Sequence, residues 1–459
     1  MWAADTRREP TPRLFCRPGQ PAELLIRGAH VLDPRSDLDG THDLLIRDGH
    51  IAEIGAPASL PVPEGGDVVE AAGKHAFPAF VDPHVHLRAP GQEHKETIAT
   101  GTAAAAAGGF CAVVAMPNTA PAIDDASILR AQAEAATREA RVPLGFLASI
   151  TRALEGKELT EMAELREAGA LGFTDDGRPV VSAGMLRKAL QYRRLCGGVL
   201  ALHEEDPALS AGGAMHEGAI SARLGLTGIP SVAESTMIAR DAALAIYEGG
   251  RLHFQHLSCT ESLSALERAK RDGARVTAEV TPHHLTLTDE CALSLDSRFK
   301  MNPPLRTGVD RRALVDALRS GLIDCVATDH APHARHEKEV PFEQAPMGTT
   351  GLETAFAALY TELVLAGELE LPVLIERMTA GAELFDLPLP RIATGELARV
   401  CVADLEASWR VGARGYVSRS ENSCFHGREL RGRVLLTLAA GVVSFRAPAL
   451  AENPVVAAL

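Results

Sequence analysis

The feature that most constrains the fold is a regular alternation between about residues 75 and 335. Short apolar runs alternate there with longer stretches rich in alanine, leucine, glutamate and arginine. Strands that are apolar throughout and separated by helices are typical of a parallel sheet covered on both faces. Eight such units predict a (β/α)8 barrel, with a doubly wound open sheet as the alternative. The apolar runs are residues 76–87, 111–117, 144–150, 170–174, 199–203, 251–257, 275–281 and 323–328.

The two flanks of this segment differ from it and resemble each other. Residues 22–55 and 395–447 contain short strand-like runs separated by glycine and Asp-Gly turn signals. We therefore expect one small β-sandwich built from both chain ends. The expected divisions are a poorly ordered, Pro- and Arg-rich extension over 1–20, the sandwich over 21–74 and 390–459, and the barrel over 75–389.

Charge and cysteine content narrow the range of partners. The chain has 46 basic and 60 acidic residues, a net charge of −14, and no basic block, which argues against nucleic acid. The longest apolar stretch, 103–117, contains two glycines and is too short to cross a membrane. The eight cysteines form no paired pattern, which predicts free thiols in a reducing cytoplasm.

Ligand-type residues gather where the predicted strands end. Barrel active sites lie at the C-terminal ends of the strands, and extended residues two apart share a face. One histidine at a strand end is usually a hydrogen-bonded structural residue, but such residues at five strand ends predict a metal site. The polar residues at the ends are His84, His86, Arg88, Asn118, Asp175, Asp176, His203, His256, His283, His284, Asp329, His330 and His333.

The mixture of imidazoles and carboxylates suits Zn²⁺ or a similar divalent ion. Four histidines and two aspartates exceed the needs of one tetrahedral ion, so we expect one or two ions, with a shared carboxylate if there are two. Such a pair can hold a hydroxide at neutral pH and polarise a carbonyl. Asp329 could also take the proton from the attacking water and return it to a leaving nitrogen. The predicted chemistry is hydrolysis, or its reverse, at an amide-like carbon.

Longer motifs carry a family resemblance. The strings VDPHVHLRAPGQEHKETIATGTAAAAAGGF, MPNT, FTDDG, GGAMHEG, TAEVTPHHL, KMNPPLR and CVATDHAPHA resemble those of bacterial type I dihydroorotases of the amidohydrolase superfamily. The resemblance extends over residues 22–457. It implies a barrel with a small β-sandwich. It also implies a cytoplasmic enzyme of pyrimidine synthesis that reversibly closes N-carbamoyl-L-aspartate to L-dihydroorotate.

The resemblance also assigns roles to particular positions. It implies that Arg88 offers a planar fork to the substrate carboxylate, and that residues 211–235 and 334–351 are long enough to cover the site. The implied metal ligands are His84, His86 and Asp329 for one ion and His203 and His256 for the other, with Asp176 bridging and Asp175 as the other candidate bridge. The implied substrate contacts are His86, Arg88, Asn118, Asn302, His333, Met347 and Gly348, with Asp329 as the catalytic proton shuttle.

Two departures bear on related enzymes. Hydantoinases, dihydropyrimidinases and allantoinases bridge their metals with a carboxylated lysine, whereas the fourth strand here ends in Phe173-Thr174-Asp175-Asp176. The string LARV at 397–400 replaces a common Ala-Asp-Leu and predicts a packing change only. The alternatives are another cyclic-amide hydrolase and a non-catalytic scaffold subunit for aspartate transcarbamoylase. We expect a homo-oligomer, a dimer, that could also associate with that transcarbamoylase.

Overall fold

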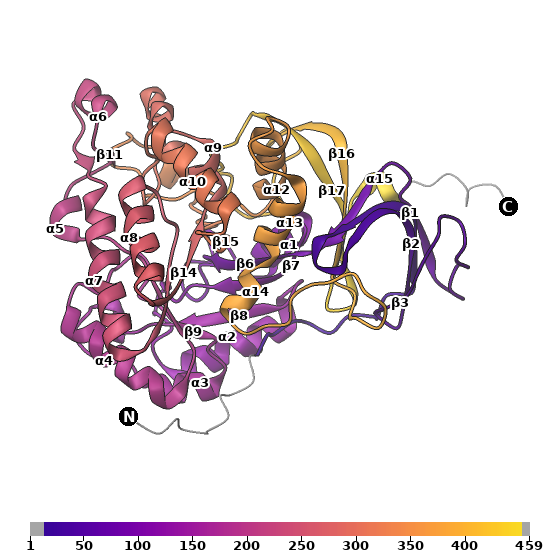
Figure 1. Ribbon diagram of the computed structural model, residues 1–459, viewed down its shortest axis with the longest axis horizontal. Coiled ribbons are helices and arrows are strands. Elements are labelled where there is room, and N and C mark those ends of the chain that lie inside the picture. The colour runs from indigo at the N-terminus through magenta and orange to yellow at the C-terminus, as the bar shows by residue number, and fades with distance from the viewer. Residues whose placement is uncertain (1–12, 452–459) are drawn as a thin grey trace.

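A closed barrel of parallel strands dominates the computed structural model, which describes residues 13–451 (Figure 1). Its sheet has the order β15-β14-β13-β10-β9-β8-β7-β6. A bridge between Val85 and His330 and a 2.9 Å hydrogen bond from His86 N to His330 O join the two edges. The predicted barrel is confirmed. Its strands are β6 (Phe80–Val85), β7 (Phe110–Ala115), β8 (Leu144–Ala148), β9 (Gly172–Phe173), β10 (Val199–Leu202), β13 (Arg251–Phe254), β14 (Arg275–Val280) and β15 (Cys325–Val326).

One helix of 7 to 17 residues follows each barrel strand and packs on the outside of the sheet (Figure 1). Local sequence sets where these helices begin and end. The Thr307 side chain accepts a hydrogen bond from Asp310 N at the start of α10, and Gly321 ends that helix at φ 82°. The helices are α1 (Ile98–Ala107), α2 (Ala126–Glu139), α3 (Met162–Ala168), α4 (Ala183–Cys196), α7 (Val232–Glu248), α8 (Thr260–Arg271), α10 (Gly308–Ser320) and α13 (Leu371–Thr379).

Shorter elements lie in the loops between these units. Within 211–235, β11 and β12 pair in parallel beside α6, and this segment stands out from the rim of the barrel (Figure 1). The short elements are α5 (Pro207–Ser210), β11 (Met215–His216), α6 (Ala219–Leu224), β12 (Gly228–Ile229), α9 (Pro282–Thr286), α11 (Arg335–Lys338), α12 (Ala355–Leu359), α14 (Gly381–Leu384) and α15 (Pro448–Ala451).

The second unit combines both chain ends, as predicted. Its strands form one sheet in the order β18-β17-β16-β5-β1-β2-β3, with β4 on β1, around a separate apolar core that includes Leu24, Ile46, Val400 and Leu436. The strands are β1 (Leu24–Asp33), β2 (Leu38–Arg47), β3 (His50–Gly55), β4 (Asp67–Glu70), β5 (His75–Pro78), β16 (Val400–Arg410), β17 (Glu429–Ala439) and β18 (Val442–Arg446).

The boundary between the two units differs from the expected one. The apolar run 76–87 is two strands: β5 pairs with β1 and β16 in the second unit, and β6 begins the barrel. Pro78 has no N–H to continue the ladder, and the next two amides bond to different units. Ala79 N donates to Arg399 O, and Phe80 N donates to Gly109 O.

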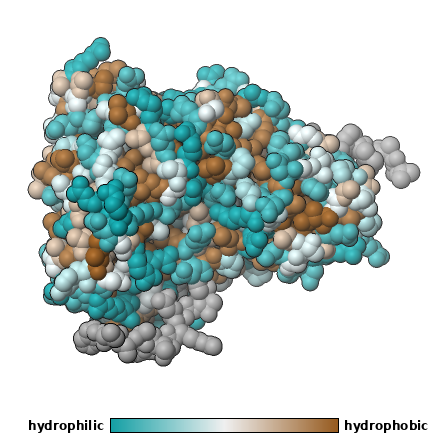
Figure 2. Space-filling view, in the orientation of Figure 1, coloured by the Kyte–Doolittle hydropathy of each residue, from teal (hydrophilic) through white to brown (hydrophobic). Residues whose placement is uncertain are grey.

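The described part of the N-terminal extension is attached to the barrel. Phe15 and Leu144 exchange hydrogen bonds of 2.9 and 2.8 Å, and the rings of Phe15 and Phe146 lie 6.2 Å apart. These contacts order residues that we expected to be poorly ordered; residues 1–12 lie outside the described part. Polar and apolar side chains are interspersed on the face in Figure 2. Across residues 13–451, no helix combines the length and apolar character needed to cross a bilayer.

Candidate metal centre and active site

A cavity of about 310 Å³ opens at the C-terminal ends of the barrel strands. Of the residues expected to bind metal or substrate, all line it except His84 and the alternative bridge Asp175, and His84 lies fully buried at its base. Of the two long loops, 334–351 contributes Met347 and Gly348, whereas 211–235 contributes no lining residue in the described chain. The predicted residues in the lining are His86, Arg88, Asn118, Asp176, His203, His256, Asn302, Asp329, His333, Met347 and Gly348.

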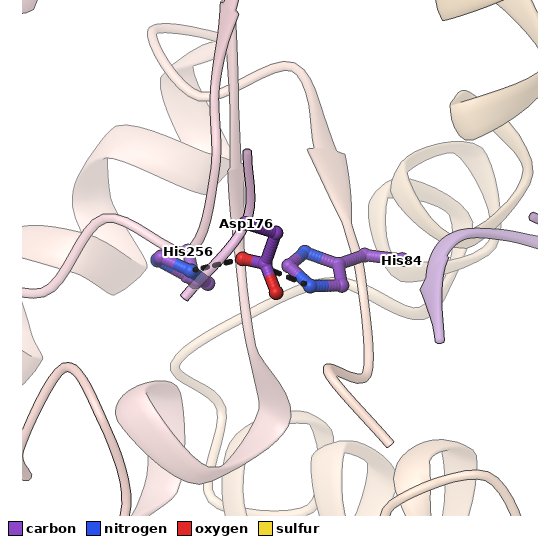
Figure 3. Close-up of side chains that lie close together, drawn as sticks. All are labelled: His84, Asp176 and His256. Carbon is purple, nitrogen blue, oxygen red and sulfur yellow. Dashed lines mark ion pairs between the residues drawn. The ribbon is translucent and has the colours of Figure 1, made fainter. Parts of the chain in front are cut away.

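Several imidazole nitrogens and carboxylate oxygens at this cavity face each other across a gap. Two contacts are direct: His86 Nε2 to Asp329 Oδ1 and His203 Nδ1 to His256 Nε2, both at 3.0 Å. Nε2 of His84 is 3.6 Å from Asp176 Oδ1 and 3.5 Å from Asp329 Oδ1, and it has no hydrogen-bond partner within residues 13–451. Nε2 of His256 is 3.5 Å from the same Asp176 oxygen (Figure 3). These separations exceed good hydrogen bonds but suit an ion that binds nitrogen and oxygen at about 2.0–2.2 Å.

Two overlapping groups of potential ligands result. His84, Asp176 and His256 form one, and His84, His86 and Asp329 form the other, each with ligand atoms within 4.8 Å of one another. The second group matches the predicted ligands of one ion. His203 adjoins the first group, with Nδ1 3.7 Å from Asp176 Oδ1.

Three of the four histidines are held through the ring nitrogen that points away from the gap. Nδ1 of His84 is 2.6 Å from Glu279 Oε1, and Nδ1 of His86 is 2.8 Å from Asn118 Oδ1. Nε2 of His203 is 2.9 Å from Glu205 Oε2. A proton on each of these nitrogens leaves the opposite nitrogen with its lone pair toward the gap, which is how outer partners orient metal-binding imidazoles.

The electrostatics of the cluster favour positive charge between the carboxylates. Burial alone would raise the pKa of Asp176 and of Asp329, but the surrounding histidines lower both well below the usual range. Burial lowers the pKa of His203, yet Asp176 and Glu205 outweigh it and raise that pKa to about 10. Either protons on the histidines or a bound cation supplies the positive charge that stabilises these carboxylates.

The two candidate bridges, Asp175 and Asp176, have opposite orientations. Asp175 accepts hydrogen bonds from Ile150 N at 2.8 Å, Thr151 N at 3.0 Å and the Thr151 hydroxyl. Its carboxylate is thereby turned away from the cavity, and burial raises its pKa to about 6. Asp176 is the member of the pair that faces the histidines, so the geometry favours it as the bridge.

The backbone at three strand ends adopts an unfavourable conformation. Arg88, His256 and Asp329 have positive φ values of 58°, 35° and 47°, which costs roughly 1–3 kcal/mol at each non-glycine position. Hydrogen bonds beneath Asp329 hold the last of these. Thr328 donates to Asp82 from its N–H at 3.1 Å and from its hydroxyl at 2.5 Å. Strain of this kind clusters at functional sites.

The polar side chains on the cavity wall opposite the histidine–aspartate cluster already make some hydrogen bonds to other protein groups. Arg88 donates from Nε to Pro332 O at 3.1 Å, which leaves the two Nη groups for an anion. Asn118 Nδ2 donates to Asp176 Oδ2 at 3.1 Å, and Asn302 Nδ2 donates to Glu205 Oε2 at 2.6 Å. His333 donates from Nε2 to Met347 O at 2.8 Å.

Residues that the sequence did not single out hold the cavity loop in place. The Lys338 ammonium donates to Pro346 O and Gly348 O at 2.8 and 3.0 Å. Asn422, from the long connection between β16 and β17, donates to Gly348 O at 3.1 Å and accepts from His333 N at 3.0 Å. Neither residue stands near a strand end in sequence, so no local pattern marks it. Glu279, in contrast, is an acidic residue inside an apolar strand, a signal that the sequence does contain.

A barrel whose strand ends carry histidines and aspartates, with a β unit from both chain ends, defines the class as an amidohydrolase-type hydrolase. Two similar solved structures are L-hydantoinase (dihydropyrimidinase) from Arthrobacter aurescens and D-hydantoinase (dihydropyrimidinase) from Thermus sp. The first has a TM-score of 0.81 and 26% identity over 92% of this chain and 96% of that one. The second has a TM-score of 0.77 and 26% identity over 92% and 95%.

Sequence comparison narrows this class to one family. The model of the Dihydro-orotase-like family matches residues 73–262. Dihydroorotase from Anaeromyxobacter dehalogenans is 46% identical over 424 residues, 91% of this chain and 96% of the relative. Dihydroorotase from Pelotomaculum thermopropionicum is 44% identical over 422 residues, 92% and 98%. The chain belongs to the dihydroorotase family and is an enzyme that acts on a small-molecule substrate, which confirms the resemblance found in the sequence.

Proposed function

We propose that this enzyme interconverts N-carbamoyl-L-aspartate and L-dihydroorotate, the ring-closing step of pyrimidine (UMP) synthesis, at the barrel cavity. The observation that carries the proposal is that one cavity contains the histidine–aspartate cluster and the open end of the Arg88 guanidinium. The cluster suits chemistry at an amide carbon, and Arg88 suits the substrate carboxylate in a protein of net charge −14. The family relatives support the same substrate.

We infer that zinc, as one or two ions, occupies the cluster. His84, His86 and Asp329 would hold one ion, His203 and His256 the other, and Asp176 both. The unpaired Nε2 of His84 and the 3.5–3.6 Å gaps around it fit such a group. A divalent ion bound there would activate water and polarise the ring carbonyl. An aspartate bridge separates this proposal from the cyclic-amide hydrolases that use a carboxylated lysine.

Asp329 would transfer the proton between the attacking water and the departing ring nitrogen. Its Oδ1 faces Nε2 of His86 at 3.0 Å, so Oδ2 remains to accept a proton from the attacking water. The neighbouring histidines hold the pKa of Asp329 below its usual range, so its carboxylate is ionised and able to accept a proton. During ring opening Asp329 returns the proton to the departing ring nitrogen, and ring closure runs the same transfers in reverse.

The two Nη groups of Arg88 are available to the substrate carboxylate. Asn118 joins them only if its Nδ2 releases one of its two acceptors, Asp176 O at 3.3 Å or Asp176 Oδ2 at 3.1 Å. His333 joins them only if its ring releases the Met347 carbonyl. Asn302, Met347 and Gly348 would form the wall beside the ring. At Gly348, φ is 134° and an added Cβ would lie 2.8 Å from Ala331 Cβ and 3.0 Å from His333 Nε2, so a side chain there would narrow the cavity.

We also propose a cytoplasmic homodimer that is able to bind aspartate transcarbamoylase. The absence of a disulfide among the eight cysteines supports the reducing compartment. Exposed apolar side chains on α4 and α7, Leu195 at 61% and Tyr247 at 75%, offer a surface for self-association. Light scattering on the purified chain, with and without the transcarbamoylase, tests both partners.

A substrate comparison tests the proposed function. Wild-type enzyme should open dihydroorotate at least about 100-fold more efficiently than dihydrouracil, the same ring without a carboxylate, or hydantoin, because only the first pairs with Arg88. Equal rates on the three compounds would contradict the substrate assignment and favour a general cyclic-amide hydrolase.

A further inference from the structure

Glu279 is a fully buried carboxylate on β14, between the metal cluster and the floor of the barrel. It accepts a hydrogen bond from Nδ1 of His84 into Oε1 at 2.6 Å. Gln255 Nε2 lies 3.2 Å from the same nitrogen, but an amide N–H cannot accept its proton. Glu279 is therefore the group that fixes which nitrogen of His84 faces the gap.

The same residue also holds the strained turn at His256. Glu279 Oε1 accepts from His256 N at 3.3 Å, and the Glu279 carbonyl accepts from Leu257 N at 3.0 Å. His256 has a φ of 35°, a conformation that needs support from its surroundings. One residue thus connects the ring of one expected ligand with the backbone of another.

His253 supports Glu279 from the floor side. Nε2 of His253 donates to Glu279 Oε2 at 3.0 Å, and its Nδ1 is 2.9 Å from the Thr277 hydroxyl. The side chains of His253 and Glu279 are fully buried. A carboxylate hydrogen-bonded on both oxygens in a dry interior has little freedom to turn.

We propose that Glu279 is a positioning residue for the metal centre, which sets the orientation of His84 and the turn at His256 with His253 as its support. The proposal rests on the proposed metal site and extends it to residues that contact neither substrate nor ion. Residues that hydrogen-bond to metal ligands in this way typically contribute 10- to 100-fold to metal affinity.

A rival interpretation exists because His253, Glu279 and Cys325 themselves lie within 4.8 Å of one another. These three residues could hold an ion at the floor. The geometry favours the positioning role, since both oxygens of Glu279 already accept hydrogen bonds from protein, Oε1 from His84 at 2.6 Å and Oε2 from His253 at 3.0 Å. A substitution at Cys325 distinguishes the two interpretations.

The test is Glu279→Gln, with Cys325→Ser as the matched control. The glutamine carbonyl can still accept the hydrogen bond from His84. Its amide can donate to His253 if the His253 ring takes its other tautomer, in which Nδ1 donates to the Thr277 hydroxyl. We therefore expect the apo-protein to fold and melt normally. Zinc affinity, measured by competition with a chromophoric chelator, should fall about 10- to 100-fold. The visible spectrum of the Co²⁺-loaded protein should shift, whereas KM for dihydroorotate at saturating metal should change less than about twofold. Cys325→Ser should leave zinc affinity within about twofold of wild type.

Two outcomes would overturn the proposal. One is a Glu279→Gln protein with wild-type zinc affinity and an unchanged Co²⁺ spectrum. The other is an equal loss of zinc affinity in Cys325→Ser, which would place an ion at the floor of the barrel. If Glu279→Gln does not fold, His253→Gln takes its place, with an expected loss of about 3- to 10-fold in zinc affinity and the same two contrary outcomes. Wild-type protein that binds no zinc at all would instead contradict the proposed function.

Discussion

The two ends of the barrel carry the same residue types and use them differently. His253 and Asp324 lie at the floor, and His256 and Asp329 lie at the mouth after the same two strands. At the floor, His253 reaches Thr277 and Glu279 at 2.9 and 3.0 Å, and Asp324 accepts from Ala278 N and Lys270 Nζ at 2.8 and 2.9 Å. At the mouth, Nδ1 of His256 has no hydrogen-bond partner among the described residues, and its Nε2 lies 3.0 Å from His203 Nδ1 but 3.5 Å from the Asp176 carboxylate.

This difference shows what separates structural polar residues from a reactive site. Buried donors and acceptors that touch each other stabilise the fold and have no capacity left for a ligand. Donors and acceptors held apart by strained backbone around a cavity are costly to keep, and a cation or substrate satisfies them. Substitutions at the mouth should therefore affect activity more than stability, and those at the floor the reverse.

The largest effect is expected for Asp329→Asn, compared with Asp324→Asn at the other end of the same strand. Without the proton shuttle, kcat should fall at least about 10³-fold, while the fold and much of the bound metal persist. Asp324→Asn should keep activity within about twofold and cost about 1 kcal/mol of stability or less. Turnover assays and urea melts measure both, and near-normal turnover in Asp329→Asn would remove that residue from the mechanism.

The next effect concerns the neighbours Asp175 and Asp176. Asp176→Ala should bind less metal and lose activity about 100-fold, because one carboxylate serves both expected ions. Asp175→Asn should instead lower stability, through hydrogen bonds to residues 150 and 151, and leave the metal content unchanged. Reconstituted wild-type protein should be equally active with and without bicarbonate. A bicarbonate requirement would mean that a carboxylated lysine, not Asp176, is the bridge.

A smaller effect is expected for Arg88→Met. The proposed charged contact with the substrate carboxylate would contribute about 1.5–3 kcal/mol, so kcat/KM for dihydroorotate should fall about 10- to 100-fold. Dihydrouracil, a very poor substrate, should be unaffected by the substitution. An equal loss on both compounds would show that Arg88 supports the fold of the cavity and does not read the carboxylate.

The smallest effect is a pH dependence of stability from Lys338. Burial, then the charge of Lys300, lowers the pKa of Lys338 to about 7. In the unfolded chain Lys338 keeps its proton up to about pH 10.4. Above pH 7 the unfolded chain therefore binds more protons than the folded chain, and the free energy of unfolding rises with pH. Between pH 7 and 9 wild type should gain about 1–2 kcal/mol relative to Lys338→Met. Parallel urea-melt curves for the two proteins would refute this assignment.

Much of the fold followed from local pattern. The eight barrel strands lie where the apolar runs predicted them, because strands buried on both faces need continuous apolar sequence. The split of residues 76–87 at Pro78 was not predicted, since apolar residues continue on both sides of the proline and the change of pairing partner is what separates the two strands. The attachment of Phe15 likewise depends on a distant partner, Leu144.

The residues that line the cavity could be predicted from strand ends and family motifs, but the residues that hold this lining in place could not. His84, His86 and Asp329 converge because the ends of neighbouring parallel strands meet at one rim. Asn422 reaches this rim from a loop of the other unit, and Lys338 from a charged helical turn. Contacts of this kind arise from tertiary packing, which a single sequence does not display. The metal and substrate roles of the lining residues stay predictions.

Metal analysis of the purified protein combined with chelation tests the central claim most directly. The mouth cluster should hold one or two equivalents of zinc per chain. Removal of zinc by a chelator should abolish dihydroorotate ring opening, and added zinc should restore it without bicarbonate. The protein with its metal removed should stay folded, because the floor contacts need no ion. Full activity in metal-free protein would contradict the account.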